Sequence, residues 1–201
     1  QGFKAPQKIY SEAGFLRAHN KKMNVYPWGI LQVNAPDAWE NSKSGEGVKV
    51  LVLDTGIDKE HPSIAARFVE GRNLINPAGS KDHPYPYFDD QGHGTHVSGI
   101  IKSVFPEVKI VALKYYDRNA SGQDNLNSTI KALEYAVSKN VDIINYSGGG
   151  PEASPEEKEL LKKAQDRGIL VVAAAGNEKS DIDDAKKKHQ QYFPANYKLN
   201  N

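Results

Sequence analysis

Four short apolar runs along the chain have the length of buried β-strands. They cover residues 48–53, 108–113, 141–146 and 169–175, and each is rich in Val, Ile, Leu or Ala. Nearly unbroken apolar runs of this length are typical of parallel strands that are buried on both faces of a sheet. The pattern therefore predicts the central strands of a parallel sheet.

Helical patterns separate these predicted strands. Apolar residues recur every three to four positions over residues 126–137, and residues 95–104 carry apolar side chains along one side. Residues 154–167 open with a serine N-cap, a proline and a capping-box glutamate, and Gly168 follows them as a stop signal. Strands that alternate with helices in this way indicate an α/β fold, in which helices sandwich a parallel sheet.

The remaining stretches carry weaker signals. Residues 1–47 are mixed and rich in turn-forming residues, with a short helix predicted over residues 35–40. Residues 71–92 are rich in Gly, Pro, Asp and Tyr, which predicts a long loop.

Composition excludes several classes of function. The 201 residues carry 26 basic and 25 acidic side chains, so no bulk positive charge would attract nucleic acid or an anionic membrane. No apolar run approaches the roughly 20 residues that cross a bilayer. The chain has no cysteine, which excludes disulfides and thiol chemistry. It begins at Gln1 without a signal-peptide pattern, so we expect a processed product or an excerpt.

Polar residues stand where the predicted strands end. Asp54 ends the first strand, Ser147-Gly148-Gly149 follow the third and Asn177 follows the fourth, while His93 begins the helix that leads into the second. In parallel sheets ligands bind beyond the carboxyl ends of the strands. We therefore expect these residues to converge on one edge of the sheet.

His93 has the surroundings of an exposed base. A helix start offers unpaired N–H groups and positive potential, which disfavour the imidazolium and keep a histidine near neutrality. Gly92 and Gly94 on either side leave the ring uncovered and allow close backbone approach. A structural histidine in a glycine-rich turn is the alternative at this point.

Three segments resemble successive signature blocks of the subtilisin-like serine proteases, or subtilases. They are Asp54-Thr55-Gly56-Ile57, His93-Gly94-Thr95-His96-Val97-Ser98-Gly99 and Ala174-Ala175-Gly176-Asn177-Glu178, in family order on the expected elements. The resemblance covers roughly residues 27–197. It implies a serine endopeptidase that acts on peptides or proteins and also meets a propeptide or protein inhibitor. It implies a secreted or cell-envelope location, with the cytoplasm left open.

The resemblance also implies roles for individual residues. Asp54 would orient the catalytic imidazole, His93 would be the general base, and Asn177 would donate a hydrogen bond to the oxyanion. Asp54 as a helix cap and Asn177 as a turn residue are the structural alternatives. We expect His96, one turn along the helix, to be packed and hydrogen-bonded, and Ser147 to be a pocket residue instead of a nucleophile.

Substrate contacts are implied in the same way. Ser147-Gly148-Gly149 and Ala174-Ala175-Gly176 are similar to the two walls of the pocket that takes the side chain before the scissile bond. Ala120-Ser121-Gly122 is similar to the edge segment that pairs with extended substrate. The small wall residues predict room for a large side chain, and Glu178 is expected at the pocket mouth with a modest preference for Lys or Arg.

Two metal sites are considered and rejected. The run that begins at Asp117, Asn119, Ser121 and Gly122 imitates a calcium loop, but Ser128 stands at the twelfth position where a glutamate is needed. His93 and His96 with Asp82, Asp89 and Asp90 suggest zinc, but the zinc-protease helix pattern with an intervening glutamate is missing. We expect no metal in this chain and no cofactor, apart from a structural calcium elsewhere in the complete domain.

One family block is missing. The family's nucleophile lies in a Gly-Thr-Ser-Met-Ala-like block well after the oxyanion asparagine, and these 201 residues contain none. We expect residues 1–26 to be an N-terminal extension and residues 27–201 to be the N-terminal part of a catalytic domain whose sheet is incomplete. The chain alone would then be inactive, and its partner would be a serine-bearing C-terminal fragment.

Other functions stay open. A non-catalytic pseudoprotease would bind extended peptides in the same groove without cleaving them. A nucleotide-binding α/β domain is disfavoured, because Asp54-Thr55-Gly56 stands where a glycine-rich phosphate loop would follow the first strand.

Overall fold

The computed structural model describes residues 28–40, 45–75, 85–184 and 191–201. The chain divides into two compact units, Gln1–Gly45 and Glu46–Asn201. The described part of the first unit holds two short helices, α2 (Trp28–Gln32) and α3 (Ala35–Glu40), so the helix predicted over residues 35–40 is present. The predicted N-terminal extension, residues 1–26, lies outside the described residues.

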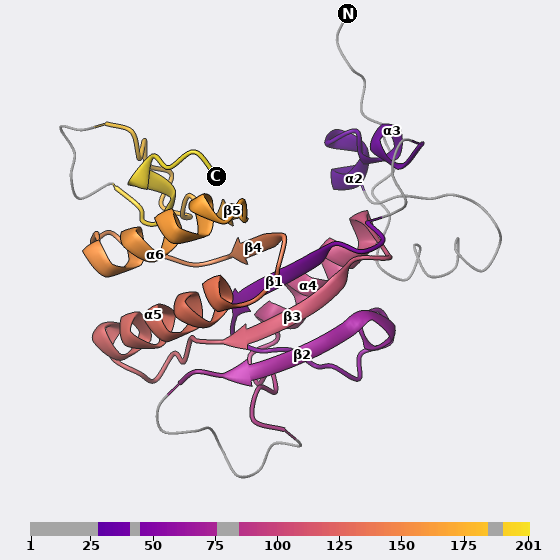
Figure 1. The fold of residues 1–201 in the computed structure, drawn as a ribbon, viewed down its shortest axis with the longest axis horizontal. Coiled ribbons are helices and arrows are strands. Elements are labelled where there is room, and N and C mark those ends of the chain that lie inside the picture. Colours follow the sequence, from indigo (N-terminus) through magenta and orange to yellow (C-terminus); the bar gives the residue numbers. More distant parts are fainter. Residues whose placement is uncertain (1–27, 41–44, 76–84, 185–190) are drawn as a thin grey trace, which may run out of the picture. The chain divides into compact units, whose positions relative to one another are not determined.

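A parallel sheet of five strands forms the centre of the second unit (Figure 1), in the order β2-β3-β1-β4-β5. All four strands predicted from apolar runs are present, which confirms the α/β fold with a parallel sheet. The strands are β1 (Lys49–Asp54), β2 (Phe68–Asn73), β3 (Lys109–Lys114), β4 (Ile143–Tyr146) and β5 (Leu170–Ala173).

The loop predicted over residues 71–92 was wrong at its start, because β2 continues to Asn73. Strand β2 lies at the edge of the sheet and pairs only with β3. An edge strand needs no continuous apolar run, and its sequence, Phe-Val-Glu-Gly-Arg-Asn, has none. Residues 76–84 of the predicted loop lie outside the described residues.

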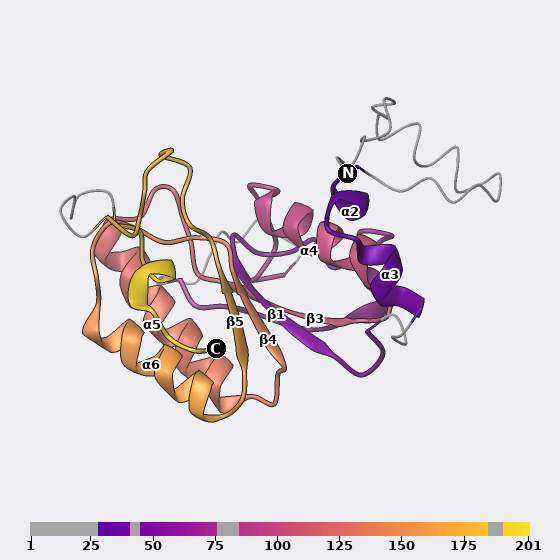
Figure 2. The ribbon, with the colours of Figure 1, turned by 90° about the horizontal axis from the view of Figure 1, so that it is seen from above.

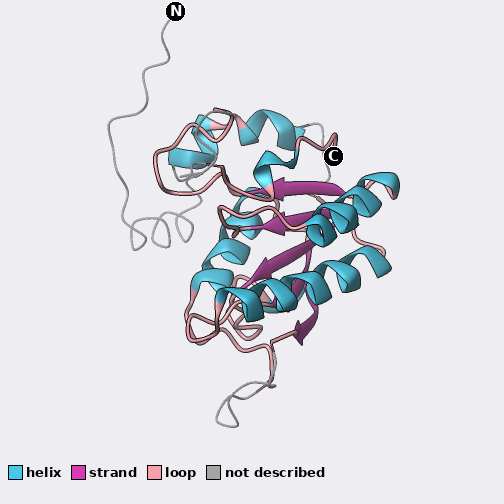
Figure 3. Cartoon of the chain, turned by 90° about the vertical axis from the view of Figure 1, so that its left-hand side faces the viewer, coloured by secondary structure: helices cyan, strands magenta, loops and turns pink. Residues whose placement is uncertain are grey.

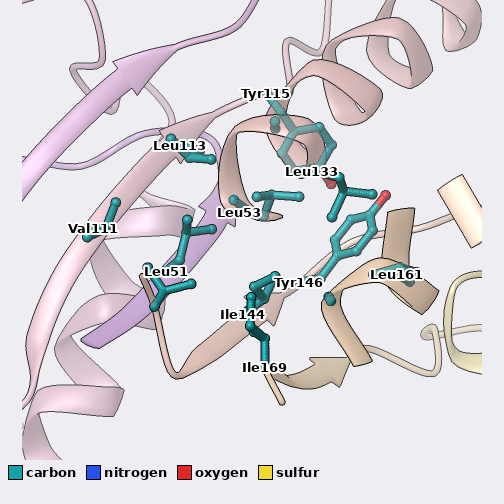
Figure 4. Packing of buried hydrophobic residues seen from close by; sticks show 14 of the residues in the cluster. Leu51, Leu53, Val111, Leu113, Tyr115, Leu133, Ile144, Tyr146, Leu161 and Ile169 are labelled. Carbon is teal, nitrogen blue, oxygen red and sulfur yellow. The ribbon is translucent and has the colours of Figure 1, made fainter. Parts of the chain in front are cut away.

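Helices cover both faces of the sheet, as the alternation along β1 requires. Leu51 and Leu53 face helices α5 (Gly122–Ser138) and α6 (Pro155–Asp166), in the core shown in Figure 4. Val50 and Val52 face helix α4 (His93–Val104) on the other side. Figure 2 shows α5 and α6 on one side of the strands and α4 on the other, and Figure 3 shows the α5–α6 layer in front of the sheet. None of the helices in the described residues is long and apolar enough to cross a membrane.

A buried carboxyl group holds the start of α6 to the C-terminal residues. Ser154 caps the helix and accepts a hydrogen bond from the backbone N–H of Glu157. The Tyr146 hydroxyl donates to Glu157 Oε1 at 2.9 Å. The Tyr197 hydroxyl oxygen lies 2.7 Å from Glu157 Oε2, 2.8 Å from the Ser154 nitrogen and 2.9 Å from the Ser154 carbonyl oxygen.

The proton count in this cluster favours a neutral Glu157. The Tyr197 hydroxyl has one proton for two neighbouring acceptors, the Ser154 carbonyl and the Glu157 carboxyl group. If Glu157 carries a proton it donates to Tyr197, and Tyr197 donates to Ser154, so every group is satisfied. Burial raises the pKa of Glu157 and outweighs the hydrogen bonds from Tyr197 and Tyr146, which lower it.

Glu157→Gln should therefore change the pH dependence of stability. A raised pKa in the folded state means that the stability Glu157 contributes is present below its ordinary pKa and is lost as pH rises through the folded pKa. The variant should match the unmodified chain at about pH 4 and exceed it in free energy of unfolding at about pH 8. Urea unfolding of both chains, with the exposed Glu159→Gln as a control, measures this. A difference that does not change with pH would contradict the neutral state of Glu157.

Candidate active site

The register of the sheet brings three predicted site segments to one level. Leu53 of β1 pairs with Tyr146 of β4, and Tyr146 pairs with Ala173 of β5. The residues that come directly after these, Asp54, Ser147 and Ala174, therefore stand side by side at the carboxyl edge. Neighbouring strands lie about 4.8 Å apart, so the expected convergence on one edge is found.

Helix α4 approaches this edge so closely that it needs a glycine. A β-carbon added at Gly94 would collide with the carbonyl oxygen of Gly56 and lie 3.1 Å from Asp54 Cβ. Gly92, the N-cap, has a φ of 94°, a left-handed conformation that favours glycine. The two glycines thus place His93, the first residue of α4, against the end of β1.

His93 and Asp54 form a hydrogen-bonded pair of unequal exposure. Nδ1 of His93 lies 2.7 Å from Oδ1 of Asp54, and the side chains are 50% and 2% exposed respectively. The backbone N–H of Thr55 donates to the same oxygen at 2.7 Å. An ionised carboxylate only accepts, so Nδ1 carries the hydrogen and Nε2 is left as a base that faces solvent.

Burial raises the pKa of Asp54, and the hydrogen bonds from His93 and Thr55 oppose that rise. The second oxygen, Oδ2, is buried and has no hydrogen-bond partner among the described residues. The hydrogen bonds from His93 and from the Thr55 backbone therefore both fall on Oδ1.

Asp89 holds the parts of the site together, and the sequence did not single it out for this role. Its carboxylate accepts hydrogen bonds from the Thr55 hydroxyl, the Gly92 backbone, and both the backbone and hydroxyl of Thr95, at 2.7–2.8 Å. The Thr55 hydroxyl in turn accepts from the Gly94 N–H at 3.0 Å. Although burial raises the pKa of Asp89, these hydrogen bonds outweigh it and hold the pKa below its ordinary value.

The predicted pocket walls meet across an aromatic ring. Ser147 accepts a hydrogen bond from the Asn145 side chain at 2.6 Å, which suits a structural residue. Gly149 in one wall and Gly176 in the other both face the ring of Tyr192. No sequence pattern points to Tyr192, because it lies well beyond both walls in the chain.

The predicted oxyanion donor is exposed after β5. No hydrogen bond holds the Asn177 side chain within the described part of the chain, so its amide is available to a ligand. The Glu178 carboxylate turns back and accepts from the Asn177 backbone N–H at 2.7 Å. Its expected place at the pocket mouth stays a prediction.

Ala120-Ser121-Gly122 forms the start of α5. Ser121 is the N-cap and accepts from the Asp124 N–H at 3.1 Å, and Gly122 is the first helical residue. The role of this segment in pairing with substrate stays a prediction.

One further expectation was wrong. His96 is exposed instead of packed, because it points away from the sheet one turn into α4.

The two rejected metal sites gain no support. The Asp117 carboxylate accepts from the Asn119 N–H at 2.9 Å, as in an ordinary turn. Within the described ranges, no group of three or more His, Asp or Glu side chains is placed to hold a metal ion. Asp82 of the zinc alternative lies outside them.

Comparison with known proteins identifies the family. A model of the subtilase family matches residues 45–201, more than half of the chain. The chain belongs to the subtilase family. Its Asp54 and His93 blocks and the segment around Asn177 all fall inside the matched region.

Several curated subtilases are similar to this one. The intracellular serine protease of Paenibacillus polymyxa is 41% identical over 173 residues, covering 82% of this chain and 51% of that protein. The major intracellular serine protease of Bacillus subtilis strain 168 is 38% identical over 185 residues, covering 87% and 56%. Subtilisin E of the same strain is 38% identical over 186 residues, covering 88% and 46%. The chain spans about half the length of the curated relatives it matches.

Asp89→Asn should weaken this subtilase chain through its site. The new amide would turn an N–H toward hydrogen-bond donors, and we expect a loss of about 1–3 kcal/mol in the free energy of unfolding at pH 7. Because the folded pKa is lowered, this advantage of Asp89 is present above its ordinary pKa and lost as pH falls through the folded pKa. Chemical unfolding at neutral and acidic pH measures it, with the exposed Asp166→Asn as control. Equal stability of the two variants at pH 7 would contradict the role of Asp89.

Proposed function

We propose that the complete protein is a serine endopeptidase in which Asp54 and His93 activate a serine supplied by a segment outside these 201 residues. The observation that carries the proposal is the 2.7 Å hydrogen bond between the buried Asp54 and the half-exposed His93. It leaves Nε2 of His93 open at the carboxyl edge of the sheet, where substrates bind in α/β folds.

The proposed chemistry uses this hydrogen-bonded pair. The serine hydroxyl attacks the carbonyl carbon of the scissile peptide bond while Nε2 of His93 takes its proton. Asp54 stabilises the imidazolium through Nδ1, and the Asn177 amide donates to the oxyanion that develops on the carbonyl oxygen. His93 then returns the proton to the leaving amine, and a water molecule, activated in the same way, hydrolyses the acyl-enzyme.

Four observations support a serine outside the chain. These residues contain no Gly-Thr-Ser-Met-Ala-like block, and the chain spans about half the length of its relatives. Ser147 sits on the predicted pocket wall and is bonded to Asn145. Leu170 and Val172 of the edge strand β5 lie on one face of the sheet and are each 49% exposed, which offers an apolar surface for a covering segment. We therefore propose residues 27–201 as part of the catalytic domain and residues 1–26 as its extension.

The proposed peptidase function implies two kinds of binding partner, a fragment of the same protease and the peptides or proteins that bind at its site. A serine-bearing C-terminal fragment would complete the domain, and peptide or protein substrates, a propeptide or a protein inhibitor would bind beside Asn177. Location is left open, because the relatives include proteins named intracellular serine proteases as well as subtilisins.

The general base is tested by His93→Ala in the complete protease. Turnover of a peptide substrate should fall by about 10³-fold or more, while peptide affinity changes little, because His93 acts in the transition state. The exposed His96→Gln, one turn along the same helix, is the matched control and should retain activity. Equal loss in both variants, or in neither, would remove His93 from the mechanism.

The nucleophile is tested by an irreversible fluorophosphonate reagent, which labels activated serines. In the complete protein the label should lie on a serine outside these 201 residues, and His93→Ala should prevent labelling. Peptide mapping by mass spectrometry locates it. A non-catalytic pseudoprotease, favoured only by the missing serine block, would bind peptides and take up no label.

A further inference from the structure

The ring of Tyr192 lies between the two segments predicted to be pocket walls. A β-carbon added at Gly149 would lie 2.7 Å from Cε1 of this ring. A β-carbon at Gly176 would lie 2.9 Å from Cδ2 and 3.1 Å from Cε2 of the same ring. Cε1 belongs to one edge of the ring, and Cδ2 and Cε2 belong to the other. The ring therefore spans the gap from wall to wall.

The two glycines are needed for this contact. Gly149 has a φ of 152° and Gly176 a φ of 88°, and neither position has room for a β-carbon beside the ring. The space beside these glycines, which suggests room for a substrate side chain, is thus occupied by the ring of Tyr192. Below the first wall a second aromatic group is close, because a β-carbon at Gly148 would collide with the hydroxyl of the buried Tyr115.

Tyr192 is held in place by its neighbours. Phe193 pairs with Gly150 through two backbone hydrogen bonds of 2.8 and 3.0 Å. Its ring packs on Tyr197 with centroids 4.8 Å apart. The carbonyl of Tyr192 accepts from the Asn196 N–H at 3.0 Å. The backbone that carries the ring is thus held at the Tyr192 carbonyl and at Phe193.

Burial raises the pKa of Tyr192, and the nearby Glu178 carboxylate adds to the rise. The hydroxyl therefore stays neutral at physiological pH, and Tyr192 acts between the walls as an uncharged aromatic group.

We propose that Tyr192 closes the primary pocket, so that the complete protease selects a small side chain, the size of Ala or Ser, before the scissile bond. This rests on the proposed peptidase function and replaces the expectation of a pocket for large side chains. A Phe or Lys side chain would have to displace a half-buried ring from between two glycines, whereas a methyl group would not.

The test compares the complete protease with its Tyr192→Ala variant on peptides that differ only in Ala or Phe before the scissile bond. The unmodified enzyme should show a kcat/KM at least about tenfold higher for Ala, and the variant should lose that preference by gaining on Phe. Tyr192→Phe keeps the ring and should keep the preference. An unmodified enzyme that prefers Phe overturns the proposal, whether or not the alanine variant folds.

Calorimetric binding of the product peptides, which end in Ala or Phe, separates this proposal from the proposed function. Tighter binding of the Ala-ended peptide without any hydrolysis would refute the peptidase and support the closed pocket. If the enzyme hydrolyses both peptides and Tyr192→Ala leaves the Ala-to-Phe ratio of kcat/KM unchanged, the closed pocket is refuted but the peptidase function is not. Absence of both binding and hydrolysis would refute both.

Discussion

The close approach of helix α4 to the end of β1 is the constraint on which the site depends. His93 is the first residue of that helix, and its hydrogen bond to Asp54 forms only because Gly94 lets the two backbones touch. Asp89 fixes this contact from a third segment by accepting from Thr55 on one side and from the start of α4 on the other. Asp89 thus positions the backbone on both sides of the His93–Asp54 hydrogen bond, which helps to fix the geometry of an exposed residue.

The same contact creates an electrostatic conflict. Asp54 must be ionised to hold the tautomer of His93, yet it is buried and its pKa is raised. Hydrogen bonds from His93 and Thr55 engage one oxygen, while Oδ2 has no partner within the described residues. A half-satisfied buried carboxylate costs stability, and proteins retain such groups where function requires them. Because its pKa is raised, Asp54 loses its charge on acidification earlier than an ordinary aspartate would.

Local periodicity in the sequence predicts four of the five strands of this sheet and little of its tertiary packing. Apolar runs found the inner strands β1, β3 and β4, where burial on both faces requires them, and also β5 at one edge of the sheet. They missed β2 at the other edge, whose sequence has no continuous apolar run. The expectation that His96 is packed was also wrong, because its side chain is exposed on α4. Asp89 and Tyr192 were missed as site residues for a common reason. Each acts through residues far from it in the chain, and no pattern of spacing reveals such contacts.

A chain of packing connects the stability of the fold to the shape of the pocket. Glu157, buried at the start of α6, binds Tyr197, and Tyr197 stacks on Phe193. Phe193 bridges to Gly150, and the residue before it, Tyr192, is thereby set between the glycine walls. Burial raises the pKa of both Glu157 and Asp54, but a protonated carboxyl group satisfies the Glu157 cluster, whereas the Asp54–His93 pair uses an ionised one.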